Sequence, residues 1–150
     1  TEIYDPPPAL FTYGNVSLLQ NTRVAIVGTR SSSQTGNEIS TELARGLSQV
    51  GITVVSGLAA GIDSAAHTGA LEGEGSTTAV LGAGVDVPYP ARNRSLHHCV
   101  GQQGLLVSEY SPGTQPAREH FPNRNRIISG LSRAIIVVQA GERSGALITA

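Results

Sequence analysis

Short apolar runs alternate along this chain with longer segments in which apolar residues recur every three or four positions. The apolar runs are VAIVG (24–28), ITVVSG (52–57), TTAVLGAG (77–84), LLVSEY (105–110) and AIIVVQA (134–140). The segments between them predict helices at 36–50, 61–73, 92–104 and 122–132. Strands that are apolar on both faces and alternate with helices indicate a parallel sheet that is covered on both sides. The pattern therefore predicts an α/β fold, Rossmann-like, with a mostly parallel sheet and helices on both faces.

Two of the predicted helices differ in the size of their apolar residues. The first places Ile39, Leu43, Leu47 and Val50 on one helical face, and Gly51 marks its end. The second, at 61–73, consists largely of small residues, so it can pack closely against a sheet.

The length of 150 residues fits one domain with a substantial core. Residues 1–20 contain three consecutive prolines and then LFTYGN, which predicts an extended arm that ends in a short strand and turn. Residues 21–150 form the predicted Rossmann-like domain. Because GALITA, at 145–150, begins another helical pattern, we expect this domain to be a fragment cut at its C-terminal end.

Composition and charge narrow the functional class. No apolar run approaches the roughly 20 residues that span a bilayer, and no secretory signal opens the chain, so a cytoplasmic location is expected. The single cysteine, Cys99, fits a reducing compartment and makes a structural zinc site improbable. The net charge is only −1, but it is unevenly distributed. Residues 1–88 carry three arginines against eight acidic residues, a balance of −5, whereas residues 89–150 carry seven against three, a balance of +4.

Ligands of parallel α/β sheets bind beyond the carboxyl ends of the strands. Here those ends carry glycines and small residues, so backbone N–H groups can approach a ligand, and the helix N-termini at that edge favour anions. The first strand is followed by Arg30, which can make a charge-assisted contact to phosphate. GxGxxG and GxxxxGK[ST] are both missing, and Ser56-Gly57 stands where a ribose-binding acid would end the second strand. We therefore expect no NAD, FAD, ATP or other cofactor.

Two further basic groups follow in the chain. The first is YPARNRSL (89–96), and the second is EHFPNRNRIISGLS (119–132), in which Phe121 adds an aromatic face suited to base stacking. Arg124 and Arg126 lie two positions apart, so on a helix they point in nearly opposite directions. One of them is expected to face the ligand and the other to form an internal salt bridge, with Glu109 as a candidate partner.

The residues that could support catalysis do not assemble into a recognisable site. Asp63 and His67 lie four apart on one helix face, but the alanines around them favour a packing or capping role. The adjacent pair His97 and His98 lacks further metal ligands, and Ser56 and Ser108 are not in a GxSxG elbow. We expect no catalytic residue and no metal.

Several long motifs, in order, resemble the DNA processing protein A family, also called Smf. They are YDPPPALFTYGN, VAIVGTR (24–30), VVSGLAAGIDSAAHTGAL (54–71), TTAVLGAGVDVPYPARN (77–93), LLVSEY (105–110), FPNRNRIISGLSRAIIVVQA (121–140) and SGALITA (144–150). The resemblance implies an extended Rossmann-like domain that binds single-stranded DNA, usually as a homodimer, and loads a RecA-type recombinase during natural transformation, without catalytic turnover.

The resemblance also implies particular residues. Arg30 and a basic residue near the YPxxN motif are the implied phosphate contacts; Arg92 and Arg94 are the candidates for the second, because Ala91 stands where many members carry lysine. Ala60 replaces a common arginine of the family. The complete predicted DNA- and phosphate-binding set is Gly28, Thr29, Arg30, Ser31, Ser56, Gly57, Gly84, Arg92, Asn93, Arg94, Phe121, Arg124, Asn125, Arg126, Ser144 and Gly145.

Two alternatives remain open on the same fold. One is an enzyme similar to nucleoside-monophosphate phosphoribohydrolases, which carry a PGGxGT loop where this chain reads AGERSGALIT. The other is a sensor that binds one small nucleotide and signals through a partner.

Overall fold

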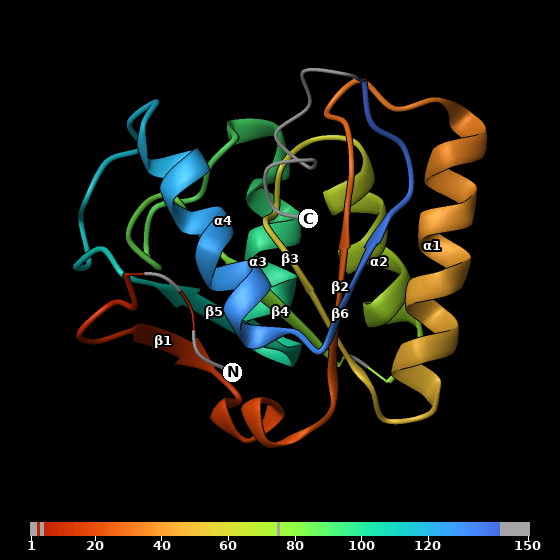
Figure 1. The fold of residues 1–150 in the computed structure, drawn as a ribbon, viewed down its shortest axis with the longest axis horizontal. Helices are drawn as coiled ribbons and strands as arrows, with labels where there is room; N and C mark the ends of the chain where they lie inside the picture. Colours follow the sequence, from red (N-terminus) through yellow and green to blue (C-terminus); the bar gives the residue numbers. More distant parts are fainter. Residues whose placement is uncertain (1–2, 4, 75, 142–150) are drawn as a thin grey trace.

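The computed structural model describes residues 3, 5–74 and 76–141 of the chain. Over these residues, six strands form one sheet in the order β1-β5-β4-β3-β2-β6 (Figure 1). The strands are β1 (Phe11–Gly14), β2 (Arg23–Val27), β3 (Thr53–Ser56), β4 (Thr77–Val80), β5 (Leu105–Ser108) and β6 (Ala134–Val137). All neighbouring pairs are parallel except β1 and β5, which pair antiparallel at one edge. The predicted mostly parallel, Rossmann-like sheet is confirmed, and so is the short strand at the end of the N-terminal arm.

Helices cover both faces of this sheet, as predicted. They are α1 (Gln34–Gln49), α2 (Ile62–Glu72), α3 (Arg94–Gln103) and α4 (His120–Leu131), with two short 3₁₀ helices, η1 (Val16–Gln20) and η2 (Ala91–Asn93). α1 and α2 pack on the face that carries Ile26 and Val54, and α3 packs beside them. α4 covers the opposite face, where Ala25, Val27, Val55 and Val80 lie. Within the described chain, no helix is both long and apolar enough to cross a membrane.

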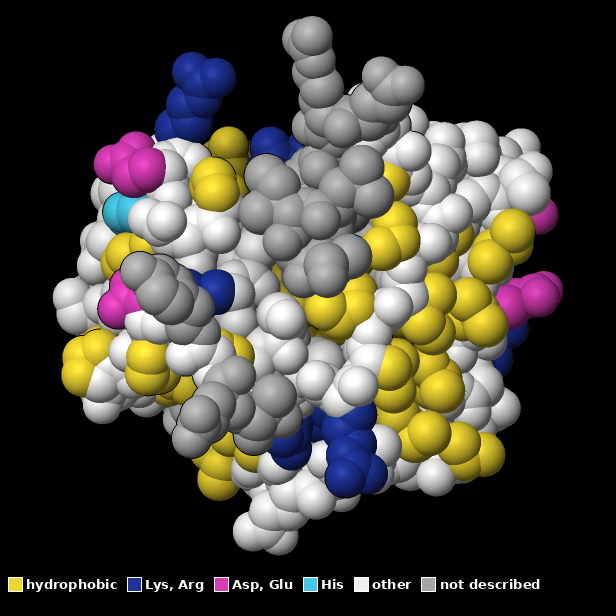
Figure 2. Space-filling view, viewed as in Figure 1, with side chains coloured by type: hydrophobic (Ala, Val, Ile, Leu, Met, Phe, Trp, Pro, Cys, Tyr) yellow, Lys and Arg dark blue, Asp and Glu magenta, His cyan; other side chains and the backbone are white. Residues whose placement is uncertain are grey.

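The helix α1 does not bury the residues that its apolar pattern favours. Ile39 is 46% exposed, Leu43 39% and Val50 72%, and only Leu47 of that face packs against the core. The buried stripe instead consists of small residues: Gly36, Ser40, Ala44 and Ser48. Apolar side chains accordingly gather on the surface over the α1 side of the molecule, at the right of Figure 2.

The close approach of α2 explains this choice of face. Ser40 Oγ donates to the Ile62 carbonyl at 3.1 Å, and Ser48 Oγ donates to the Ala70 carbonyl at 2.8 Å. A Cβ atom added at Gly69 would overlap the Thr41 carbonyl oxygen. Because the two helix backbones are this close, small hydroxylated residues fit between them and leucine does not.

The strand β6 differs from the expected fully buried strand. Ala134 is exposed and Ile135, Ile136 and Val137 are only half-buried. The reason is its position: among the described residues, β6 pairs with β2 on one side alone.

Candidate functional site

A groove of about 470 Å³ lies beside the carboxyl end of β2, between the first turns of α1 and α2. Its lining residues are Arg30, Ser31, Ser32, Asn37, Thr41, Ala60, Gly61, Ser64, Ala65, Thr68, Arg92 and Asn93. Arg30 and Arg92 are exposed and lie 62 positions apart in the sequence, so the fold brings two of the three predicted basic groups together. Five of the other ten lining residues carry hydroxyl groups. The groove therefore offers positive charge and hydrogen-bond donors to an anionic, polar ligand.

Arg30, which lines the groove, also contacts an aromatic ring. The guanidinium carbon of Arg30 lies 5.5 Å from the centroid of the Phe121 ring, within the range of a cation–π contact. Tyr89, which is 45% exposed, places its ring 5.4 Å from the same Phe121 ring at an interplanar angle of 33°. Arg30 thus lines the polar groove and also contacts Phe121, one ring of the aromatic pair.

The two arginines of α4 have different surroundings. Arg126 donates to both oxygens of Glu109, at 2.8 and 2.7 Å, so it makes the internal salt bridge that the sequence predicted. These hydrogen bonds hold the pKa of Glu109 below its ordinary value. Arg124 is only 4% exposed, and its Nη1 donates to the carbonyls of Gly57 and Val80 at 2.9 and 2.8 Å.

Arg124 therefore lies beneath the surface rather than on it. Its guanidinium carbon is 5.4 Å from the centroid of the Phe121 ring, and its Nε donates to Asn125 Oδ1 at 2.9 Å. Burial lowers the pKa of Arg124 to about 10, which leaves it protonated at neutral pH. The nearby carboxyl of Asp63 opposes that shift. The role that this geometry supports is to fix Phe121 from below.

The strand-end glycines make room for the protein's own side chains. A Cβ atom at Gly57 would lie 2.8 Å from the Arg124 guanidinium carbon, and one at Gly82 would lie 2.9 Å from two carbons of the Phe121 ring. A Cβ at Gly28 would overlap the side chain of Ile62, and one at Gly84 would lie 2.8 Å from Asp86 Oδ1. Close packing explains these glycines without a ligand, which differs from the expected approach of backbone N–H groups.

The N-terminus of α1 is likewise engaged by the protein itself. Ser33 Oγ accepts from the Gly36 N–H at 3.0 Å, and the Ser33 N–H donates to Gln139 Oε1 at 3.0 Å. The Thr29 N–H donates to the Gln139 carbonyl at 2.7 Å, and Thr29 Oγ1 accepts from the Ser31 N–H at 3.2 Å. Gln139, which sequence reasoning did not single out, thus joins the segment after β6 to the loop that carries Arg30.

Asp63 and His67 support the loop between β3 and α2. Asp63 is 6% exposed and accepts from the Gly57 N–H at 3.1 Å. His67 is fully buried: its Nε2 accepts from the Leu58 N–H at 3.2 Å, and its Nδ1 donates to Thr77 Oγ1 at 2.8 Å. Burial, with a smaller effect from nearby Arg124, lowers the pKa of His67 to about 3. Burial also raises the pKa of Asp63. Neither group reaches the groove, which agrees with the packing role expected from the sequence.

The other predicted site residues differ in how far their side chains are buried. Asn93 is 8% exposed and donates to the Leu58 carbonyl and to Ser64 Oγ, both at 2.9 Å, so it fixes the wall of the groove. Ser56 is fully buried and donates to the Ile26 carbonyl at 2.6 Å. Arg94 is exposed at the start of α3. Ser144 and Gly145 lie outside the described residues.

Sequence reasoning did not select several residues that lie in the groove or beside Phe121. The packing of α1 against α2 brings four of them to the groove: Asn37, Thr41, Ser64 and Thr68. The turn after β4 brings the fifth, Tyr89, beside Phe121. Neither arrangement can be read from the sequence. The two prolines that flank Tyr89 were the one available hint that its ring is held in place.

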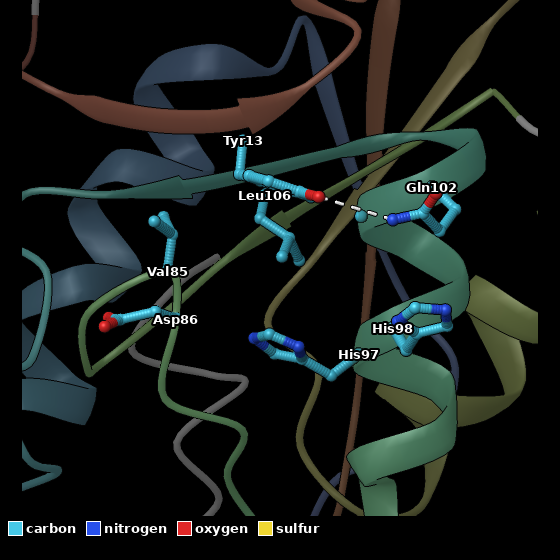
Figure 3. Close-up of a pocket in the computed structure, with 8 residues that line it drawn as sticks. Tyr13, Val85, Asp86, His97, His98, Gln102 and Leu106 are labelled. Atoms are coloured by element: carbon cyan, nitrogen blue, oxygen red, sulfur yellow. Dashed lines mark hydrogen bonds between the residues drawn. The ribbon is translucent and has the colours of Figure 1, made fainter.

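A second cavity, of about 290 Å³, lies between β1, β5 and α3 (Figure 3). Tyr13 and Leu106 form part of its wall, and Gln102 Nε2 donates to Tyr13 Oη at 3.3 Å. His97 and His98 leave α3 in different directions, and only His97 points towards Val85 and Asp86 (Figure 3). Over the described stretches of chain, no group of three or more His, Cys, Asp or Glu side chains is placed to hold a metal ion. This cavity carries none of the arginines.

The fold and the groove together define a Rossmann-like domain with a cationic and aromatic surface at the carboxyl ends of its strands. The family described as DNA recombination-mediator protein A matches this chain over residues 1–150, and the chain belongs to that family. The resemblance to the DNA processing protein A family is thereby confirmed.

Individual relatives agree with this assignment. The chain is 50% identical over 149 residues to the DNA processing protein DprA of Streptococcus pneumoniae, covering 99% of this chain and 52% of that protein. It is 43% identical over 147 residues to the protein Smf of Escherichia coli, covering 97% of this chain and 39% of that protein. The chain thus spans about half the length, or less, of these relatives.

Solved structures show the same fold. The X-ray structure of DNA processing protein A from Streptococcus pneumoniae superposes with a TM-score of 0.91 at 49% identity, covering 98% of this chain and 52% of that one. A structure of DNA processing protein A from Helicobacter pylori, described as having a unique single-stranded DNA binding mode, superposes with a TM-score of 0.90 at 34% identity. It covers 97% of this chain and 66% of that one.

Proposed function

We propose that this domain binds single-stranded DNA as part of a recombination mediator and that it performs no catalytic turnover. The observation that carries the proposal is the position of Arg30, whose guanidinium faces the Phe121 ring and also lines a groove that contains Arg92. Proteins that bind single strands combine a positive groove for the backbone with aromatic faces for the bases. The described single-stranded DNA binding of the Helicobacter pylori relative supports the same ligand.

The phosphate contacts in this proposal are Arg30 and Arg92, with Ser31 and the hydroxyl groups of the groove as further donors. Arg94 extends the positive charge along the start of α3. Ser144 and Gly145 stay in the proposal on the strength of the family motif alone. Loading of a RecA-type recombinase, homodimer formation and a cytoplasmic location belong to the same proposal, supported by membership of the family.

Replacing Arg30 by alanine is expected to weaken binding of oligo-dT by about tenfold or more, because one charge-assisted hydrogen bond to phosphate is lost. The dependence of log K on log salt is expected to become shallower by about 0.7, the value for one phosphate contact on a single strand. Fluorescence anisotropy of labelled oligo-dT across a salt series measures both quantities.

Arg133 provides a matched control, since it is exposed and directly precedes β6. It therefore lies at the amino ends of the parallel strands, whereas Arg30 follows the carboxyl end of β2. Arg133→Ala is expected to leave the affinity and the salt dependence nearly unchanged. An Arg30→Ala protein that binds oligo-dT like the wild type would contradict the proposal. Release of free base from AMP or CMP would instead support a phosphoribohydrolase-like enzyme, and tight binding of a mononucleotide without affinity for oligo-dT would support a nucleotide sensor.

A further inference from the structure

Tyr89 presents an exposed aromatic ring beside Phe121. Tyr89 is 45% exposed, whereas Phe121, its neighbour at 5.4 Å, is half-buried. A single exposed aromatic residue is unremarkable in a protein surface. An exposed ring packed beside a second ring, which itself contacts the exposed guanidinium of Arg30, needs a more specific explanation.

The Phe121 ring is held in one orientation. Gly82 leaves the space that the ring occupies, because a Cβ atom there would lie 2.9 Å from two ring carbons. The preceding residue, His120, is hydrogen-bonded through Nδ1 to the Gly82 carbonyl at 2.9 Å. The guanidinium groups of Arg30 and Arg124 each lie within 5.5 Å of the ring centroid. Phe121 is therefore a fixed support against which Tyr89 packs.

The backbone around Tyr89 is also restrained. Pro88 and Pro90 flank the residue, and proline limits both its own φ and the conformation of the residue before it. The Asn93 N–H donates to the Pro90 carbonyl at 2.9 Å, which joins this turn to η2, the element that carries Arg92. A ring on a restrained backbone loses little conformational entropy when a ligand stacks on it.

We propose that Tyr89 is a second base-stacking residue and that Tyr89 and Phe121 together form the binding site for an unpaired nucleobase. This inference rests on the proposed function. Arg30 contacts the Phe121 ring and lines the same groove as Arg92, which follows Tyr89 by three residues, so cationic groups for the phosphates lie close to the ring pair. Since every base has a π-face, this site accepts all four bases.

The test compares Tyr89→Ala and Tyr89→Phe with the wild type on two strands, oligo-dT and an oligo-dT of equal length whose central nucleotides are abasic. Tyr89→Ala is expected to bind oligo-dT about fivefold or more weakly, the lower end of the range for one lost stacking contact. Tyr89→Phe keeps the ring and is expected to bind like the wild type. The advantage of oligo-dT over the abasic strand shrinks in Tyr89→Ala, while the salt dependence stays the same because no phosphate contact is removed.

Tyrosine fluorescence gives a second readout of base stacking on Tyr89. The protein has no tryptophan and four tyrosines, so its ultraviolet emission comes from tyrosine. Quenching of that emission by oligo-dT is expected in the wild type and is expected to be smaller in Tyr89→Phe. Thermal unfolding of each variant verifies that the fold is intact.

The outcomes separate this inference from the proposed function. If Tyr89→Ala binds oligo-dT like the wild type while Arg30→Ala still weakens binding, Tyr89 does not stack and the proposed function stands. If Tyr89→Phe is as weak as Tyr89→Ala, the hydroxyl rather than the ring makes the contact, which also overturns the inference. If the wild-type protein does not bind oligo-dT, the proposed function itself fails.

Discussion

Acidification from pH 7 to pH 4 is expected to lower the free energy of unfolding by about 3 kcal/mol through His67 alone. The pKa of this side chain is about 3 in the folded protein, against an ordinary value of 6.5. Between these two values the unfolded chain binds a proton at His67 and the folded protein does not. This contribution to stability is therefore complete above about pH 6.5 and is lost progressively as the pH falls towards 3.

The hydrogen bonds of His67 also indicate that the folded protein disfavours the protonated ring. Its Nε2 already accepts a hydrogen bond from the Leu58 N–H at 3.2 Å, and its Nδ1 donates to Thr77 Oγ1 at 2.8 Å. A second ring proton would face the Leu58 N–H and leave a buried positive charge close to Arg124. Protonation of His67 is therefore expected to break the hydrogen bond that holds the loop between β3 and α2.

Urea unfolding of the wild type and of His67→Gln at pH 7, 5.5 and 4 measures this effect. Asp63, whose pKa is raised, shifts stability in the opposite direction, so the difference between the two proteins isolates His67. Glutamine does not titrate, so the variant is expected to lose about 3 kcal/mol less than the wild type over this range. Equal losses in the two proteins would show that His67 becomes protonated without unfolding.

The second large effect is expected at Arg124, whose replacement by alanine should lower the free energy of unfolding by about 3 kcal/mol or more. The side chain is 4% exposed, and its removal leaves the Gly57 and Val80 carbonyls without their hydrogen bonds to Nη1. It also leaves the buried Asp63 carboxyl without its nearby positive charge. The Phe121 ring loses its support from below in the same variant.

Arg126→Ala is the matched control, because Arg126 lies on the same helix and makes a partly exposed ion pair with Glu109. Its replacement is expected to cost about 1 kcal/mol. Thermal or urea unfolding of the two variants, side by side with the wild type, gives the comparison. Equal stability of the two variants would mean that the buried position of Arg124 has no energetic consequence.

The strands and their order of succession with helices could be predicted from the sequence, because buried parallel strands are apolar on both faces. The contact surface of α1 could not. Its apolar residues predicted one face, but the short distance to α2 selects the face of Ser40, Ala44 and Ser48 instead. Such a distance depends on tertiary packing, which a helical pattern does not contain.

The candidate site, like the fold, could be predicted from the sequence only in part. Arg30 and Arg92 could be placed at the carboxyl edge of the sheet, because strand ends and loops are visible in the sequence. The sequence could not decide between Arg124 and Arg126, because both lie on one helix and only the positions of Glu109 and of the Gly57 carbonyl distinguish them. The strand-end glycines were visible, but the side chains that fill the space beside them were not.

Amide chemical-shift changes on titration of isotope-labelled protein with oligo-dT show whether DNA binds at the groove of Arg30 and Arg92 and at the ring of Phe121. Large changes are expected in the Thr29–Ser32 loop, in residues 60–68, around Tyr89–Arg92 and near Phe121. Large changes confined to β1, the outer side of α3 or the exposed face of α1, with the Arg30 loop unaffected, would contradict this expectation.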